Sequence, residues 1–492
     1  MKMTKRILAA LMALIVATVF SLGALAEDAG ANGNPPDGMP GEPPQGMGEP
    51  PEGMGNPPDG MPGEPPEGGM PGGPGGGPGG GFGGGSADFE YAGATEIIAT
   101  ADESDGVYAS ATADESALIV NTAEDVTLDN PTVTKTGDSN GGDSCNFYGL
   151  NAAVLAMGGG TVTITGGTIT SDADGANGVF CYGGNGAQNG GAGDGTTVYI
   201  SDTTIATTGD GSGGIMTTGG GVTYASNLTV ETNGRSSAAI RTDRGGGTVV
   251  VDGGSYTSNG LGSPAIYSTA DITVSNATLT SNLSEGVCIE GLNSITLNDC
   301  DMTANNTQRN SNATFLDTIM IYQSMSGDAD SGTSHFTMNG GSLTSLSGHM
   351  FHVTNTHAVI TLSGVQLVNG DADGVLLSVC DDGWSGADNI AELNAVGQVL
   401  TGTILVGDNS TLTLNLTDGA SFEGSIGGEI VNAKGETVSA EVGSVTVTLD
   451  DTSTWTLTAD TWITGFNGDA ANVHANGYTL YVNGAALEGV SE

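Results

Sequence analysis

Positive charge is scarce in this sequence. The chain of 492 residues has 9 lysine and arginine residues against 56 aspartate and glutamate residues, a formal net charge of −47 at pH 7. Proteins bind nucleic acids and anionic membrane surfaces through basic patches. The composition therefore argues against a nucleic-acid partner and against electrostatic attachment to a membrane.

Long apolar runs are also lacking, with one exception at the N-terminus. Residues 7–25 are mostly apolar, follow Lys2, Lys5 and Arg6, and end in the small-residue pattern Ala-Leu-Ala. This pattern predicts a secretory signal peptide over residues 1–26. No other run approaches the roughly 20 apolar residues of a membrane-spanning helix. We expect a secreted protein without a transmembrane segment, either released or held non-covalently at the cell surface.

Cysteine is too sparse and too scattered for a disulfide framework. The five cysteines are odd in number and show no CxxC spacing. We expect buried thiols, with a single disulfide between Cys288 and Cys300 as the alternative. The cysteines are Cys145, Cys181, Cys288, Cys300 and Cys380.

Proline is concentrated in the segment that follows the predicted signal peptide. Pro-Pro pairs recur there every seven or eight residues, between glycines and acidic residues, and the tract ends in a glycine run. Such a composition cannot bury enough apolar surface to offset the entropy lost on ordering. Residues 27–86 are therefore predicted to be a disordered acidic linker.

Helical periodicity is absent after the linker, where short alternating strands recur instead. Segments such as "VTITGGTIT", "VYISDTTIA" and "ITVSNATLT" begin at Val162, Val198 and Ile272, and the intervals along the whole series are 36, 36, 24, 27, 23, 23, 41 and 23 residues. In several units a second apolar patch follows 17 residues after the first. A fixed unit near 23 residues with insertions is typical of a solenoid. The sequence predicts an all-β, right-handed parallel β-helix over residues 87–400.

The end of such a solenoid must be covered, because exposed strand edges invite aggregation. Residues 401–492 contain shorter repeats and a cluster of aromatic residues. We expect shorter terminal coils and a β cap in this region. The aromatic residues of the predicted cap are Trp455, Trp462, Tyr478 and Tyr481.

Several of these segments together resemble a family of secreted bacterial proteins. The segments "TVTITGGTIT", "SGGIMTTGGG", "SSAAIRTDRGGG" and "NGYTLYVNG" resemble those of right-handed β-helix proteins described as adhesin-like or carbohydrate-binding-like. More distantly, the fold resembles that of pectate lyases, polygalacturonases and autotransporter passengers. The resemblance implies the fold and display outside the cell, but fold alone does not carry an activity.

The enzymatic motifs of the related folds are incomplete. Polygalacturonases carry an Asp-Asp pair, a Gly-His-Gly and an Arg-x-Lys on successive coils. Here Asp381-Asp382 is present, but Gly348-His349 precedes it and no Arg-x-Lys exists. A lyase needs Ca²⁺ and a base, and the coil offsets predict that Arg244 and Glu290 point along different corners. We therefore favour a protein that is not an enzyme, while leaving catalysis open.

Two short segments supply candidate ligand-binding residues. "RTDRGGG" places Arg241, Asp243 and Arg244 together. We interpret this segment as a coil corner in which the arginines pair with acidic neighbours, with recognition of an anion or a sugar acid as the alternative. Trp384 lies in an inserted loop and either packs the loop or stacks on a sugar ring.

Calcium is the candidate cofactor. "SGDADSG" places Asp328 and Asp330 beside glycine in a turn, which suits an oxygen-binding cation such as Ca²⁺. The segment does not complete a twelve-residue calcium loop, and Asp-Gly turns are common in β-solenoids. A Ca²⁺ site is expected here if the protein has one.

The predicted function follows from the scaffold and its insertions, because loops on a rigid scaffold often carry binding groups. We expect an adhesin-like surface or secreted protein that binds glycans or other surface polymers. The alternative is a polysaccharide lyase or glycoside hydrolase that uses a groove formed by the inserted loops.

Overall fold

The computed structural model describes residues 90–186 and 191–492. The predicted signal peptide and linker lie outside these ranges. Within them the regular secondary structure is almost entirely strand, and the helices are α2 (Asp143–Phe147) and a 3-10 turn, η1 (Ala470–Asn472). Neither of these two helices is long and apolar enough to cross a membrane.

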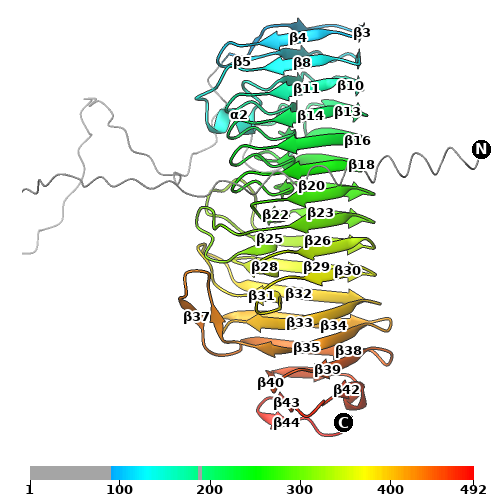
Figure 1. Cartoon of the computed structure of the whole chain (residues 1–492), viewed down its shortest axis with the longest axis vertical. Helices are drawn as coiled ribbons and strands as arrows, with labels where there is room; N and C mark the ends of the chain where they lie inside the picture. Colours follow the sequence, from blue (N-terminus) through cyan, green and yellow to red (C-terminus); the bar gives the residue numbers. More distant parts are fainter. Residues whose placement is uncertain (1–89, 187–190) are drawn as a thin grey trace, which may run out of the picture. The chain divides into compact units, whose positions relative to one another are not determined.

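The strands form two large parallel sheets that share every coil. One coil contains β10, β11 and β12, and the next contains β13, β14 and β15, which pair in parallel with their counterparts. Val162 thus lies beside Val198, and Val179 beside Ile215. Figure 1 shows the coils stacked one above another. The predicted parallel β-helix is confirmed.

The larger sheet has 22 strands and takes up to two strands from each coil. Its strands are β3 (Ala101–Ser104), β4 (Val107–Ser110), β7 (Val126–Asp129), β8 (Thr132–Lys135), β10 (Thr161–Thr165), β11 (Thr168–Ser171), β13 (Thr197–Ser201), β14 (Thr204–Thr207), β16 (Gly221–Thr232), β18 (Gly247–Ser258), β20 (Asp271–Ser275), β21 (Thr278–Ser281), β23 (Ser294–Asn298), β24 (Asp301–Ala304), β26 (Thr333–Asn339), β27 (Ser342–Ser345), β29 (His357–Ser363), β30 (Gln366–Asn369), β32 (Asn389–Val396), β34 (Ser410–Thr417), β38 (Ser444–Leu449) and β41 (Gly465–Asn467).

The second sheet has 15 strands, one from each coil. Its strands are β2 (Glu96–Ile97), β6 (Leu118–Asn121), β9 (Val154–Met157), β12 (Val179–Tyr182), β15 (Ile215–Thr218), β17 (Ile240–Thr242), β19 (Ile266–Ser268), β22 (Val287–Glu290), β25 (Asp317–Tyr322), β28 (His349–Thr354), β31 (Val375–Val379), β33 (Val399–Val406), β35 (Ser421–Gly427), β39 (Thr454–Leu457) and β42 (Val473–His474). The remaining short strands are β1 (Ala92–Gly93), β5 (Glu115–Ser116), β36 (Ile430–Val431), β37 (Thr437–Ser439), β40 (Thr461–Ile463), β43 (Leu480–Val482) and β44 (Ala485–Ala486).

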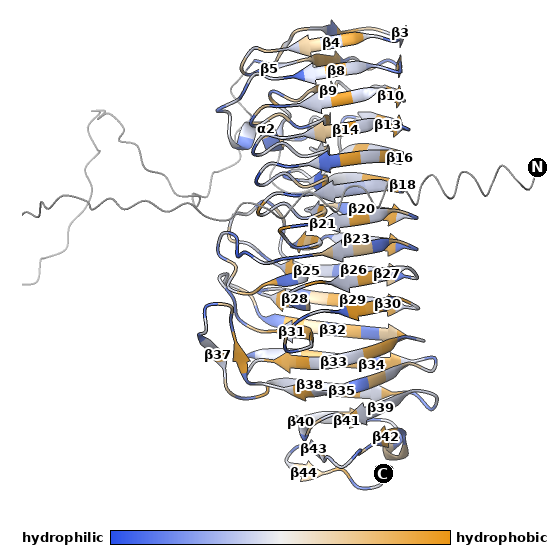
Figure 2. Cartoon of the chain, viewed as in Figure 1, coloured by the Kyte–Doolittle hydropathy of each residue, from blue (hydrophilic) through white to orange (hydrophobic). Residues whose placement is uncertain are grey.

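Buried and more exposed positions alternate along the strands of the larger sheet, where Figure 2 shows hydrophobic and hydrophilic residues on the same strands. In β32, for example, buried and partly exposed positions alternate over all eight residues. The buried positions carry Val, Ile, Leu and Ala, and each stacks on the same position of the next coil. Outside, amides stack in the same register, and the Asn339 side chain donates to Asn298 Oδ1 at 3.0 Å. The alternation that predicted strands therefore places the core inside the coils.

One corner of the coils approaches its neighbours too closely for any side chain. A Cβ atom added to Gly234 would lie 1.8 Å from the carbonyl oxygen of Gly209, and one added to Gly260 would lie 1.8 Å from that of Gly234. Both contacts are to backbone, which cannot move aside cheaply. The three glycines are therefore required by the stacking distance between successive turns.

All five cysteines are buried free thiols. Cys300 belongs to the central core, whereas Cys288 faces outward from the second sheet and packs with Met320 and Tyr322. The prediction of buried thiols is confirmed, and the alternative Cys288–Cys300 disulfide is wrong, because the two side chains project into different clusters.

Parallel stacking continues past residue 400 to the C-terminal end. The Trp455 ring is fully buried in the core, donates its Nε1–H to the Gly424 carbonyl at 3.0 Å, and stacks on Phe422 with ring centroids 5.7 Å apart. Trp462 instead stacks on Tyr481 at the surface and is 48% exposed. Tyr478 is exposed as well. Of the four aromatic residues predicted to plug the end, Trp455 fills the core.

We predict that Trp455→Ala lowers the free energy of unfolding by about 3–5 kcal/mol, because it empties a large core site and leaves the Gly424 carbonyl without its donor. Trp462→Ala is the matched control and should change stability by less than about 1 kcal/mol. Urea unfolding followed by circular dichroism measures both. Equal losses for the two variants would show that Trp455 does not hold the C-terminal coils.

Candidate binding pocket

A pocket of about 780 Å³ lies on the outer face of the second sheet. The sheet alternates core-facing and outward-facing side chains, so Ile266 and Val287 point inward while Tyr267 and Cys288 are paired neighbours on the outer face. The next strand, β25, continues this surface, with Met320 beside Cys288 and Tyr322 beside Glu290. These outward side chains form the floor of the cavity, which we call the main pocket.

The walls of the main pocket come from segments that leave the coils. They include α2, the turn after β17, the insertion between β24 and β25, the loop after β25 and the loop between β31 and β32. The repeat of 41 residues between Ile295 and Phe336 supplies two of these walls. Wall residues that carry polar or aromatic groups are Asp143, Phe147, Arg244, Asn310, Asn312, Ser324, Ser326, Asp328 and Trp384.

Four aromatic rings line the main pocket. The Trp384 and Tyr322 rings are tilted against each other with centroids 4.9 Å apart. The Arg244 guanidinium lies over the Phe147 ring at 4.1 Å, and the Arg241 guanidinium lies 5.6 Å from the centroid of Tyr267. The sequence does not single out Phe147, Tyr267 and Tyr322, since a single aromatic residue in a helix or strand is usually only a packing residue.

Glu290 is the most heavily hydrogen-bonded carboxyl group of the pocket and is 1% exposed. Its Oε2 accepts from the Tyr267 hydroxyl at 2.6 Å and from the Tyr322 hydroxyl at 3.2 Å, while Oε1 accepts from Ser324 and, at 3.3 Å, from Ser326. Burial raises the pKa of Glu290, and the hydrogen bonds from Ser324 and Tyr267 oppose this only in part. Four hydroxyl groups of the chain already occupy its two oxygens, so a ligand donor can bind Glu290 only by replacing one of them.

The two arginines of "RTDRGGG" are both neutralised within the chain. Arg241 pairs with Asp243 at 2.7 Å, and Arg244 pairs with Asp328 at 2.6 Å. Burial raises the pKa of Asp243 to about 6, although Arg241 acts in the opposite direction. Arg244 lines the main pocket, whereas Arg241 and Asp243 lie beside it under Tyr267. The predicted pairing of the arginines with acidic residues is present; ligand binding by them stays a prediction.

The expectation that Arg244 and Glu290 point along different corners is wrong. Both line the main pocket. The turn that leads into β17 spans residues 233–239, whereas the turn that leads into β22 spans residues 282–286. The longer turn absorbs two residues before the strand begins. Counting residues from the start of each repeat therefore misaligns β17 with β22. The observed strand pairing aligns Ile240 with Ile266, and Ile266 with Val287.

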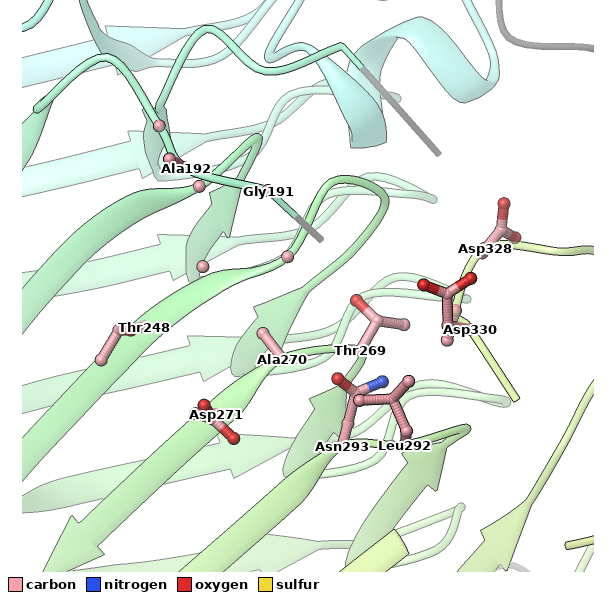
Figure 3. A pocket seen from close by; sticks show the side chains of 15 residues that line it. Gly191, Ala192, Thr248, Thr269, Ala270, Asp271, Leu292, Asn293, Asp328 and Asp330 are labelled. Atoms are coloured by element: carbon pink, nitrogen blue, oxygen red, sulfur yellow. The ribbon is translucent and has the colours of Figure 1, made fainter. Parts of the chain in front are cut away.

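The acidic turn predicted to hold Ca²⁺ has another partner. Asp328 Oδ1 accepts from both Nε and Nη2 of Arg244, at 3.2 and 2.6 Å. Figure 3 shows Asp328 and Asp330 at a smaller cavity of about 390 Å³, lined also by Thr248, Thr269 and Asp271. In the described part of the chain, no three or more His, Cys, Asp or Glu residues gather as a metal site. The Ca²⁺ prediction gains no support from this geometry.

A second cluster has the residue types of a hydrolytic triad. The Ser378 hydroxyl lies 2.7 Å from His352 Nδ1 and 2.8 Å from His349 Nδ1, and His352 Nε2 lies 3.4 Å from Asp382 Oδ2. A serine nucleophile must reach its substrate. Here Ser378 and His352 are fully buried, and Phe315 stacks on His352 at 4.6 Å. The cluster is therefore structural.

The structural role of this cluster is to fasten two walls of the main pocket. Asp382 Oδ1 accepts from the Thr314 amide at 2.7 Å, the Thr314 hydroxyl at 2.6 Å and the Gly383 amide at 2.7 Å. Burial raises the pKa of Asp382, but the bonds from His352 and Thr314 outweigh it and the net pKa is lowered. Asp382, the second residue of the Asp-Asp pair, thus joins the insertion before β25 to the loop that carries Trp384.

The chain matches no protein-family model, no curated protein and no solved structure. The stacked parallel sheets confirm the β-solenoid fold, whereas the resemblance to a family of secreted proteins stays a prediction. Any function must be argued from the pocket itself.

We predict that His349 makes the protein less stable in mild acid. Burial, reinforced by His352, lowers the pKa of His349 to about 4, from an ordinary value of 6.5. The unfolded chain then binds a proton that the folded chain does not, so stability falls as the pH drops from about 6.5 to about 4. His349→Asn should lose less free energy of unfolding over this window, as measured by urea unfolding at several pH values.

The comparison of the parent protein with the His349→Asn variant isolates the contribution of His349 to the pH dependence of stability. Buried carboxyl groups with raised pKa values act in the opposite direction, but they are present in both proteins and cancel in the difference. The same loss of stability in both proteins would contradict the assignment.

Proposed function

We propose that this protein is an exported, adhesin-like β-helix that binds a glycan in the main pocket. The observation that carries the proposal is the lining of that pocket: four aromatic rings stand beside carboxyl, amide and hydroxyl groups on one face. Sugars present apolar C–H faces and hydroxyl groups around the edge of the ring. A site that combines ring faces with hydrogen-bonding oxygens matches both.

The size of the pocket supports a sugar ligand. Its volume of about 780 Å³ falls in the range of about 300–1,000 Å³ that is typical of ligand sites. The smaller cavity of about 390 Å³ is also lined by Asp328, so the two cavities meet at this residue. A polymer with several sugar units fits such a pair better than a single small molecule. Export is supported by the predicted signal peptide and the strongly acidic composition.

A second candidate function is hydrolysis of the bound glycan. Glycoside hydrolases use two carboxyl groups, one of which is held protonated. Glu290 has its pKa raised by burial, and Asp328 is close enough to raise that pKa further. This arrangement favours a general acid beside a carboxylate. The same binding experiment separates the two functions, because a hydrolase shortens the polymer that it binds.

We predict that Trp384→Ala weakens glycan binding about tenfold, since it removes one ring face from the pocket. The full chain would be screened on a glycan array, and the best ligand measured by calorimetry. Trp462→Ala is the control, because Trp462 is an exposed ring outside the pocket. Mass analysis of the recovered polymer tests for cleavage.

Weaker binding by Trp384→Ala alone, with intact polymer, supports the adhesin-like function. Shortened products would instead favour the hydrolase. Equal binding by both variants and the parent protein would remove the main pocket from the proposal.

A further inference from the structure

The charged residues that line the main pocket are mostly acidic. Its lining has four acidic residues, Asp143, Glu285, Glu290 and Asp328, and one basic residue, Arg244. Arg244 is already bound to Asp328 and covers the Phe147 ring. Arg235 reaches the rim, where it donates to Asn310 Oδ1 at 3.1 Å, but it does not line the cavity. Three carboxyl groups of the lining are therefore left without a basic partner in the pocket.

A further buried carboxyl group lies near Glu285 without lining the pocket. Asp317 is 1% exposed, and its Oδ1 has no hydrogen-bond partner. Glu285 and Asp317 each have a pKa raised by burial, and Glu285 raises that of Asp317 further. The Cys288 thiol on the floor has its pKa raised by burial and by Glu285, Asp317 and Glu290 in turn. The buried carboxyl groups of this region are thus costly to ionise in the absence of a cation, and a bound cation would favour their ionised form.

We propose that the main pocket selects glycans that carry a positively charged ammonium group, that is, amino sugars whose nitrogen is not acylated. This proposal rests on the proposed glycan-binding function and specifies its substrate class. An ammonium group offers three donors to carboxyl oxygens such as those of Glu290. It also interacts favourably with the faces of Trp384 and Tyr322, since aromatic rings attract cations.

The same geometry discriminates against acidic sugars. A uronate would bring a negative charge next to Glu285 and Glu290. Neither Arg241 nor Arg244 is free to receive it, because each is bound to its own aspartate. Recognition of a sugar acid by the arginines, the alternative raised from the sequence, is therefore disfavoured relative to recognition of a cation.

The test compares three hexasaccharides, one positively charged, one neutral and one negatively charged. Hexamers of glucosamine, of N-acetylglucosamine and of galacturonic acid would be titrated into the full chain by calorimetry at physiological salt, at a pH at which the amino groups are protonated. We expect the glucosamine hexamer to bind at least about tenfold more tightly than the N-acetylated hexamer, and the galacturonate hexamer not to bind. N-acetylated hexamer binding as tightly as the glucosamine hexamer would overturn the charge selection while leaving the glycan-binding function intact.

Two variants separate the pocket from the general acidity of the chain. Glu290→Gln should weaken binding of the glucosamine hexamer about tenfold and leave the N-acetylated hexamer unchanged within about twofold. Glu423→Gln is the matched control, because Glu423 is an exposed carboxylate on β35 and does not line the pocket. Equal weakening by both variants would mean diffuse attraction and would overturn the proposal. Binding of none of the hexamers, with no ligand on the glycan array, would overturn the glycan-binding function as well.

Discussion

The structure depends on the in-register stacking of one coil on the next. Each strand of the two large sheets hydrogen-bonds to the equivalent strand of the neighbouring coil. Each side chain must therefore fit against the side chains at the same position in the coils above and below it. The column of Gly209, Gly234 and Gly260 shows how tight this constraint is, because no side chain fits between the turns. Inserted residues can leave the stack only at the corners between strands, and there they form the walls of the main pocket.

The main pocket therefore combines a rigid floor with walls that need fastening. The floor inherits its geometry from strand pairing, which sets Tyr322 beside Glu290. The walls are held by buried polar contacts, above all those of Asp382 to Thr314. Such contacts keep long loops in one arrangement at a cost in desolvation. The hydrolase-like grouping of Ser378, His352 and Asp382 serves this purpose in a sealed site.

The repeat period was sufficient to predict the fold, because the spacing of Val, Ile and Leu records the stacking directly. The pocket could be predicted only in part. Arg244, Asp328 and Trp384 stood out as unusual residues in loops, and all three line it. Tyr267, Tyr322 and Glu290 look like ordinary strand residues, and turns of different length hide the pairing of Tyr267 with Cys288 and of Glu290 with Tyr322. Charge pairing between Arg244 and Asp328 joins segments 84 residues apart, which no local pattern records.

The stacked architecture also has a consequence for how this protein can change over generations. Each coil contacts mainly its two neighbours, so most of the main pocket is built by one run of coils, from β17 to β31. The exception is α2, which supplies Asp143 and Phe147 from an earlier coil. New specificities can therefore arise by changes confined to this run of coils, provided that its contacts with α2 are kept.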